Sequence, residues 1–205
     1  MAFSSGTVSP MRSPTRQSYG VRGLRAKTLI AAAAILAESS VEEMSLRVIA
    51  ERAGIGIASI YHYFRNKEEL LLDLTVMGFE ELRQNIVGER ATGDVPDPVG
   101  AAARAFFGFA ASNPSLFRLM YNERFLLRHE RLRAAEHETF LTFQAAVEHD
   151  ARFPPELHDN LALALWALGR GIAATISSQP AGRLSPEAEK IWAGVNYLVS
   201  RTRIV

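Results

Sequence analysis

The chain has 205 residues, of which 48% are apolar, and its formal net charge is only +1. This length allows one or two domains with a sizeable core. The chain contains no cysteine, which excludes disulfide bonds and thiolate metal sites and suits a reducing cytoplasm. The longest apolar runs, at residues 31–37 and 161–168, are too short to cross a bilayer, and the N-terminus shows no signal-peptide core. We therefore expect a cytoplasmic protein without a membrane partner.

Charge is distributed unevenly along the chain. Residues 1–67 hold nine Lys and Arg against four Asp and Glu, whereas the remainder holds 14 against 18. A basic N-terminal part on an acidic body favours a polyanionic partner for that part alone. Such an imbalance also arises by chance on solvent-exposed faces. It supports a polyanionic partner only if a binding motif lies in the same region.

Residues 1–20 are rich in Ser, Pro, Gly and Thr and lack apolar periodicity, which predicts a disordered arm. Arginines in this arm would suit the minor groove of DNA, although a tail without a role is the simpler interpretation. The Ala-rich stretch from about residue 22 to residue 39 repeats apolar side chains at helical spacing and predicts a helix.

The segment that begins at Ser45 is the most informative part of the chain. Apolar side chains at spacings of three and four, behind Ser45 as the N-cap, predict a short helix that Gly54 ends in the left-handed conformation. A second short helix follows, with Gly56 as its N-cap and with Ile60 and Phe64 facing inward. The opposite face is small, exposed and uncharged, as a recognition helix in a major groove requires. Its members are Ile57, Ala58, Tyr61 and His62.

This segment resembles the DNA-binding domain of the tetracycline-repressor (TetR) family of bacterial regulators. The resemblance covers about the first third of the folded chain and fixes residue types at many spacings. The chain departs from the family at Gly56, where Ser or Thr is more common, which implies a weaker cap and one phosphate contact fewer. The matching residues are Ser45, Ile49-Ala50, Ala53-Gly54-Ile55, Tyr61-His62-Tyr63-Phe64 and Lys67-Glu68-Glu69-Leu70.

The resemblance implies double-stranded DNA as a partner, with phosphates supplying most of the affinity and base edges the specificity. Ser45 lies at a helix start that suits a phosphate, and Arg47 can reach the backbone or a guanine. Tyr61 and Lys67 match positions that the family uses on phosphates. The other side chains of the second helix suit thymine methyl groups or hydrogen bonds to bases. The predicted DNA-binding residues are Ser45, Arg47, Ile57, Ala58, Ser59, Tyr61, His62 and Lys67.

A long helix is predicted from Asn66, its N-cap with Glu69 as capping-box partner, to about Val87. Residues 88–98 are predicted to form a loop and the domain boundary. Every later segment has a helical pattern, at residues 99–112, 114–122, 124–150, 155–178 and 185–203. The predicted fold class is therefore all-α, with an N-terminal three-helix helix-turn-helix domain and a C-terminal helical bundle for ligand binding and dimerisation. The predicted division is an arm at 1–20, a DNA-binding domain at 21–67 and a ligand-binding and dimerisation domain at 68–205.

The C-terminal part is similar to TetR-type domains that carry a Trp-His-Gly signature. In that pattern a Trp is followed four residues later by His-Gly, whereas here Trp166 is followed by Arg170 and Gly171. Because Arg170 replaces the His, the role of that His is not carried over to this chain.

The last two predicted helices carry more apolar residues than one buried face on each helix requires. An ordinary core is one explanation. The family resemblance instead implies a homodimer through a four-helix bundle, with half-sites of a palindromic operator about 34–36 Å apart. The residues concerned are Trp166, Leu168, Ile172, Ile176, Ile191, Trp192, Val195, Leu198 and Val199.

Aromatic and sulfur-bearing side chains are dense in the C-terminal part, which suits a pocket for a small organic inducer of unknown identity. A packed core is the more ordinary use of such residues. Arg170, if it points inward, would be an unpaired charge and would indicate either an interface ion pair or an anionic ligand group. The predicted ligand-binding residues are Phe107, Phe117, Met120, Tyr121, Phe143, Trp166 and Arg170.

We therefore expect a sequence-specific DNA-binding regulator, a ligand-released homodimeric repressor in which the ligand swings the long helix and changes the separation of the recognition helices. An enzyme is the main alternative, but no nucleotide-binding loop, nucleophile elbow or zinc-protease motif is present. His129 and His137 suit a solvated face better than a metal site, because Arg133 lies between them. A protein-interaction module is the third possibility. No cofactor, metal or catalytic residue is expected.

Overall fold

The computed structural model describes residues 23–91 and 97–177, together with Pro186, Lys190, Ile191, Ala193, Gly194 and Tyr197. Within these residues the regular structure is helical and contains no strand, which confirms the predicted all-α class. The predicted N-terminal arm and most of the helix predicted at residues 185–203 lie outside the described residues.

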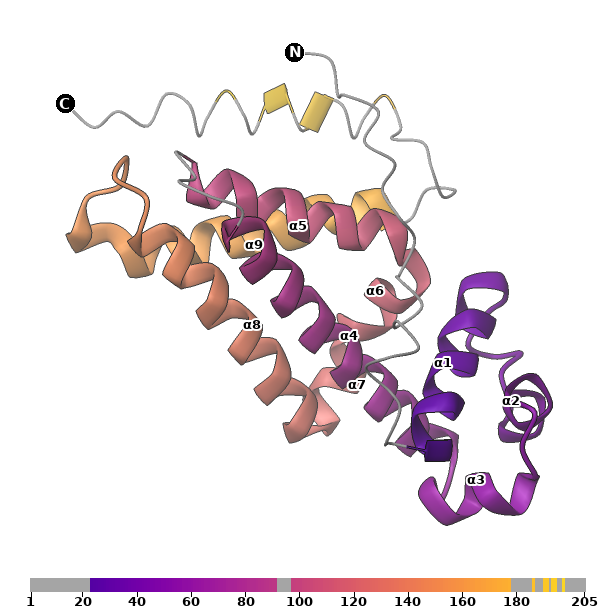
Figure 1. Cartoon of the computed structure of the whole chain (residues 1–205). Helices are drawn as coiled ribbons and strands as arrows, with labels where there is room; N and C mark the ends of the chain where they lie inside the picture. Colours follow the sequence, from indigo (N-terminus) through magenta and orange to yellow (C-terminus); the bar gives the residue numbers. More distant parts are fainter. Residues whose placement is uncertain are drawn as a thin grey trace.

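The first three helices form a small lobe at one end of the molecule (Figure 1). They are α1 (Gly23–Glu38), α2 (Leu46–Ala53) and α3 (Ile57–Tyr63). Gly54 follows α2 with φ 65° and ψ 37°, and its N–H donates to the carbonyls of Ala50 and Glu51. This left-handed residue turns the chain sharply into α3, as the sequence predicts.

A single long helix, α4 (Lys67–Ala91), leads from the small lobe into the rest of the molecule (Figure 1). Asn66 caps it, because its Oδ1 accepts a hydrogen bond from the Glu69 amide at 2.9 Å. The Glu69 carboxylate accepts from the Arg65 amide at 2.7 Å, one residue before the amide used in a regular capping box. The helix continues beyond its predicted end at Val87, since the helix-forming residues after Gly88 outweigh that glycine.

The remaining helices form the body. They are α5 (Pro98–Ser112), α6 (Pro114–Met120), α7 (Glu123–Arg128), α8 (Glu130–Glu148) and α9 (His158–Ser177), with a 3₁₀ turn at Pro155–Leu157 where the sequence predicts the start of the last of these helices. α4 packs mainly against α5 and α8, and α9 packs against the same two helices. The short α6 and α7 connect α5 to α8 on the side of the small lobe (Figure 1).

The helix predicted at residues 124–150 is in fact two helices, because the chain breaks at His129. The backbone there is extended, with φ −121° and ψ 101°. The break brings His129 Nε2 to 3.1 Å from Glu68 Oε1 on α4 and packs the imidazole ring against Phe125. No proline or glycine marks this position, so contacts between helices, not local preference, set the break.

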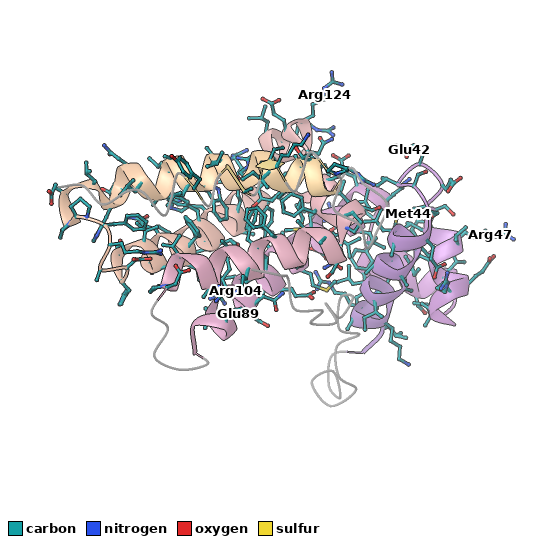
Figure 2. The ribbon with its side chains drawn as sticks, turned by 90° about the horizontal axis from the view of Figure 1, so that it is seen from above. Glu42, Met44, Arg47, Glu89, Arg104 and Arg124 are labelled. Carbon is teal, nitrogen blue, oxygen red and sulfur yellow. The ribbon has the colours of Figure 1, made fainter. Side chains whose placement is uncertain are left out.

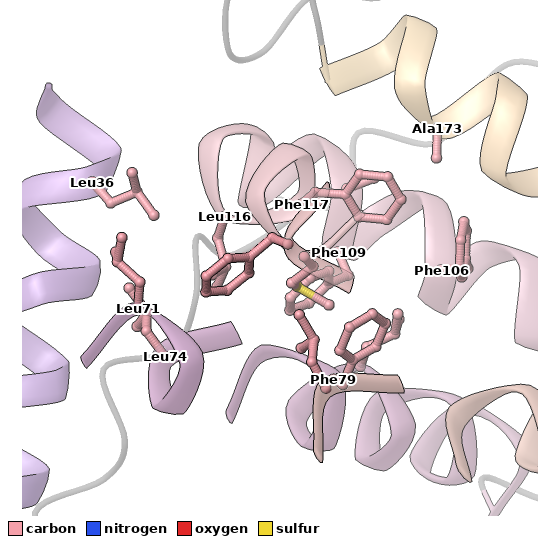
Figure 3. Close-up of a cluster of buried hydrophobic side chains, with 14 of the residues drawn as sticks. Leu36, Leu71, Leu74, Phe79, Phe106, Phe109, Leu116, Phe117 and Ala173 are labelled. Carbon is pink, nitrogen blue, oxygen red and sulfur yellow. The ribbon is translucent and has the colours of Figure 1, made fainter. Parts of the chain in front are cut away.

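One hydrophobic core runs through both the small lobe and the body (Figure 3). At their junction Leu36 of α1 faces Leu71 of α4 and Leu116 of α6. All three leucines are buried, and burial of one such side chain stabilises the fold by about 1.5–3 kcal/mol. The small lobe is therefore fixed to the body by shared apolar packing as well as by the continuous chain.

α4 crosses α6 closely at Gly78. A Cβ atom on this glycine would lie 2.7 Å from the Met120 sulfur and 3.2 Å from Cδ2 of Leu116. Both of these side chains are buried in the core, so they have little space into which to move. The glycine therefore permits the close contact through which α6 packs on α4.

We predict that Gly78→Val lowers the free energy of unfolding by about 1–3 kcal/mol relative to Gly88→Val, because only the first substitution overpacks the core. Gly88 lies on the same helix, and nothing lies within 4 Å of a Cβ atom there. Both substitutions replace a glycine within α4, so the difference between them reports mainly the steric effect. Urea unfolding measures it, and equal stabilities would contradict the close crossing.

Candidate nucleic-acid interface and effector core

The outer face of α3 is open to solvent. The inner face is anchored by Ile60 and Phe64, which have no exposed surface. On the outer face Tyr61 is 57% exposed and Ile57 is 40% exposed, Ala58 and His62 are exposed, and Ser59 is half-buried. No part of the chain that the structure describes therefore covers the side chains predicted to meet DNA bases.

Two predicted phosphate-binding residues lie on or beside α2. Ser45 is exposed, and its hydroxyl oxygen accepts a hydrogen bond from the Val48 amide at 3.2 Å, which leaves the hydroxyl proton available to an acceptor. Arg47 points away from the small lobe (Figure 2). Its side chain is 85% exposed and lies 3.3 Å from Glu51 in a surface pair of the kind worth about 0.3–0.5 kcal/mol. Such a pair leaves the guanidinium free to change partners.

Lys67 is placed differently from the other predicted contacts. It is half-buried, and its ammonium donates a hydrogen bond to the carbonyl of Val41 in the loop before α2. It also lines a groove of about 400 Å³ between the small lobe and the body, with Val41, Glu68, Leu71, Leu119, Asn122, Phe125 and Arg128. A contact from Lys67 to a phosphate requires its side chain to leave Val41.

Ion pairs hold the first half of α4 to both parts of the molecule. Asp73 on α4 is only 5% exposed. Arg25 of α1 donates to its Oδ2, and Nη1 of Arg131 on α8 lies 2.7 Å from its Oδ1. One turn earlier, Glu68 lies within ion-pair distance of Arg128 and His129. The carboxylates of α4 thus connect the small lobe with α7 and α8.

The residues predicted to bind a ligand come together in one cluster of rings inside the body. Trp166 of α9 packs on Phe143 of α8 at a centroid distance of 5.6 Å and on Phe106 of α5 at 5.2 Å. Phe117 and Tyr121 lie 4.7 Å apart, and Met120 is fully buried beside α4. Phe107 is half-buried and contacts Phe106 at 5.7 Å, on the edge of the cluster.

Phe106, Phe140 and Phe79 belong to this cluster but not to the predicted ligand-binding set. Phe79 of α4 is fully buried, and its ring lies 5.2 Å from that of Tyr121. It shares the buried stripe of α4 with Leu82 and Ile86, at offsets of three and seven residues. That helical spacing is the signal that identifies Phe79 as inward-facing.

Arg170 is paired within the subunit. Its Nη1 lies 3.2 Å from Glu136 Oε1, and its guanidinium carbon lies 4.7 Å from the centroid of the Tyr121 ring. The cation is therefore stabilised by a carboxylate and by an aromatic face, so its charge requires neither a second subunit nor an anionic ligand. Burial raises the pKa of the Tyr121 phenol well above its ordinary value, an effect that Glu136 strengthens and Arg170 opposes. The hydroxyl therefore keeps its proton.

The expected dimer surface needs a correction. Trp166 and Ile172 are buried in the core of their own subunit, because α9 turns them toward α5 and α8. The side chains of Ile176, Trp192, Val195, Leu198 and Val199 lie outside the described residues. Leu168 and Ile191 are exposed, as expected for such a surface. The exposed face of α9 is apolar and also includes Leu163, Ala164, Ala167, Gly171 and Ala174.

No three His, Asp or Glu side chains converge as a metal site in the ranges 23–91 and 97–177 or at the six further described positions. In the same residues no helix is both long and apolar enough to span a membrane.

Comparisons with known proteins match both parts of the chain. Residues 29–74 match the family described as bacterial regulatory proteins, tetR family, and residues 99–195 match the tetracyclin repressor-like C-terminal domain. The HTH-type transcriptional regulator Rv1816 of Mycobacterium tuberculosis is 35% identical over 83 residues, which cover 38% of this chain. The match spans only 35% of the length of that relative.

Solved structures share the fold at low sequence identity. A regulatory protein of the tetR family from Rhodococcus RHA1 has a TM-score of 0.59 and 19% identity, covering 86% of this chain and 95% of that chain. The fatty acid degradation regulator FadR from Bacillus halodurans has a TM-score of 0.61 and 18% identity, covering 73% of this chain and 82% of that chain. Since the matches to the small lobe and to the body point to the same family, this chain belongs to the tetR family of bacterial regulatory proteins.

Proposed function

We propose that the protein is a sequence-specific DNA-binding transcriptional regulator, specifically a homodimeric repressor that binds a palindromic operator and is released by a small organic ligand. The observation that carries this proposal is the exposed, uncharged outer face of α3 beside the solvent-exposed Arg47, in a segment that matches the family. Short side chains on α3 suit base edges in a major groove, while the flanking cation suits the backbone. We assign DNA binding to residues 21–67 and ligand binding and dimerisation to residues 68–205.

Phosphate contacts would surround the base-reading face of α3. The Ser45 hydroxyl, the Arg47 guanidinium and the Tyr61 hydroxyl are exposed and belong to the same small lobe. Lys67 would join them by exchanging the Val41 carbonyl for a phosphate oxygen, which is a stronger acceptor for a cation. Gly56 caps α3 without a side-chain hydrogen bond, so the contact that a Ser or Thr would add there is absent.

A second copy of the chain is the proposed partner of the exposed face of α9. Leu163 and Leu168 are 59% and 41% exposed there, and the alanines and glycine between them would let a partner helix approach closely. Contiguous apolar patches of this kind mark interaction sites in soluble proteins. A two-fold axis through this face would place two α3 helices on half-sites about 34–36 Å apart.

The ring cluster of the body is the proposed ligand site. Apolar and aromatic linings with a few polar groups are typical of sites for organic molecules. Here the polar groups are the Tyr121 hydroxyl and the pair formed by Arg170 and Glu136. Phe79 brings α4 itself into the lining, so a ligand among these rings would press on the helix that leads to the small lobe.

Coupling between the ligand and DNA would pass through α4. A ligand shifts an equilibrium only when it binds one arrangement better than another. Asp73 binds an arginine from α1 and an arginine from α8, so movement of α8 relative to α4 changes a contact shared with the small lobe. We propose that this shared carboxylate helps to transmit the position of the body to α1–α3.

The DNA-binding proposal is tested on the operator obtained by selecting bound sequences from random DNA. We expect a palindrome, and we expect Tyr61→Ala and Lys67→Ala each to weaken its binding tenfold or more, which corresponds to about 1.4 kcal/mol. Leu127→Ala removes an exposed side chain (67%) from the body and should leave binding unchanged. Circular dichroism verifies that each variant is folded.

Normal operator affinity in both test variants would show that the contact surface lies elsewhere. Absence of salt-sensitive DNA binding by the wild-type protein would favour the enzyme or protein-interaction alternatives.

We predict that Leu163→Glu converts the dimer into a monomer at micromolar concentration, because each subunit would bury an unpaired charge in the interface. Leu127→Glu places the same charge on an exposed leucine outside α9 and should leave the dimer intact. Sedimentation velocity measures both variants. A dimeric Leu163→Glu protein would show that another surface joins the subunits.

We predict that Arg131→Ala increases hydrogen exchange of the α1 amides about fivefold, which corresponds to about 1 kcal/mol of lost local stability. Arg131 is on α8, so an effect on α1 must pass through Asp73. Arg83→Ala serves as the control, because it removes an ion pair with Glu80 that lies within α4. A change confined to α8 would contradict the proposed coupling.

A further inference from the structure

The hydroxyl of Tyr121 is enclosed by the protein and has no hydrogen-bond partner among the residues that the structure describes. A buried polar group without a partner destabilises a fold, because it has lost its bonds to water and gained none. The Tyr121 ring packs on two phenylalanine rings, at centroid distances of 4.7 Å for Phe117 and 5.2 Å for Phe79. A phenylalanine at position 121 would pack against the same rings without this disadvantage. Packing alone therefore does not account for the hydroxyl.

We infer that the ligand of this protein carries an uncharged carbonyl oxygen on an apolar ring body, and that the Tyr121 hydroxyl donates a hydrogen bond to that oxygen. This inference rests on the proposed ligand site and specifies its chemistry. The protonated hydroxyl can donate one hydrogen bond, and a carbonyl oxygen of the ligand would accept it. The rings of Phe79, Phe106 and Phe117 around Tyr121 favour a flat apolar body that packs edge to face with them.

The charges beside Tyr121 favour a neutral acceptor over a carboxylate. Arg170 lies over the Tyr121 ring, and its charge is balanced by Glu136 at 3.2 Å. A carboxylate ligand would be repelled by Glu136, or it would have to break the Arg170 pair and leave Glu136 half-buried without its cation. A ketone or ester oxygen encounters neither penalty. The Arg170 side chain is 40% exposed, so solvent already reaches the group that covers the ring.

The position of the hydroxyl also gives the ligand a mechanical role. Tyr121 directly follows α6, whose Met120 packs against Gly78 of α4, and its own ring packs on Phe79. A molecule hydrogen-bonded to Tyr121 would therefore be linked to α4 through the Tyr121 and Phe79 rings, near the close crossing of α4 and α6 at Gly78. Its binding would act on α4 through these rings.

The first test needs no ligand. Tyr121→Phe removes only the oxygen, so we expect the melting temperature of the full chain to stay the same or to rise by about 2–4 °C. Tyr63→Phe, on an exposed tyrosine, is the control and should cause no change. A fall in the melting temperature of Tyr121→Phe of about 2–4 °C or more would show that the hydroxyl is already satisfied in the free protein. That result would overturn the inference.

The second test uses three probes with the same ring system: 2-acetylnaphthalene, 2-ethylnaphthalene and 2-naphthoate. Trp166 lies 5.2 Å from Phe106, and Trp192→Phe leaves it as the single tryptophan, so its fluorescence reports binding. We expect the ketone to bind about tenfold more tightly than either other probe, and we expect Tyr121→Phe to abolish that preference. Equal affinities for the three probes, tighter binding of the naphthoate, a preference that survives in Tyr121→Phe, or no binding of any probe would each overturn the inference.

Operator binding by the wild-type protein without a probe separates this inference from the proposed function. Failure of the wild-type protein to bind DNA would contradict the regulator proposal while leaving both Tyr121 measurements interpretable. Normal DNA binding with a failed probe preference would contradict only the inferred ligand chemistry.

Discussion

α4 belongs to the cores of both parts of the molecule, and the rest of the arrangement depends on this sharing. Its first turns complete the small lobe through the fully buried Leu70 and Leu74, and its middle packs between α5, α6 and α8. Asp73 adds an electrostatic constraint, because a buried carboxylate is tolerated only with compensating partners, and these come from α1 and α8. A three-helix lobe of this size buries too little surface to be stable alone. Its geometry is therefore tied to that of the body.

α3 shows the same dependence on a smaller scale. α3 has only two turns, and an isolated helix of that length is unstable in water. Its orientation comes from the left-handed Gly54 at one end and from the burial of Ile60 and Phe64 along its inner face. The outer face can then be small and uncharged, because none of its side chains is needed to hold the helix in place. The buried side of this short helix provides its stability, which leaves the exposed side free for the proposed contact with DNA.

Sequence reasoning predicts the features that depend on a few neighbouring residues. The caps at Ser45 and Asn66, the left-handed Gly54 and the inward side chains of α3 follow from local spacing, and the structure contains all of them. Sequence reasoning does not predict the break at His129 or the pairing of Arg170 with Glu136, because both depend on which helices pack against each other. The ring cluster lies between these cases. Its aromatic density is visible in the sequence. Phe79 is not predicted as part of the cluster, because it lies on a helix that is expected only to connect two domains.

The continuous core described at the junction restricts how this lobe can be recombined with other proteins. A cut at the end of α3 would separate Leu36 of α1 from Leu71 of α4 and Leu116 of α6. A functional chimera must therefore carry the first turns of α4 with the lobe and must offer a matching apolar surface at α6. Exchange of the small lobe between such proteins is therefore limited by the packing of three leucines and not by the length of a linker.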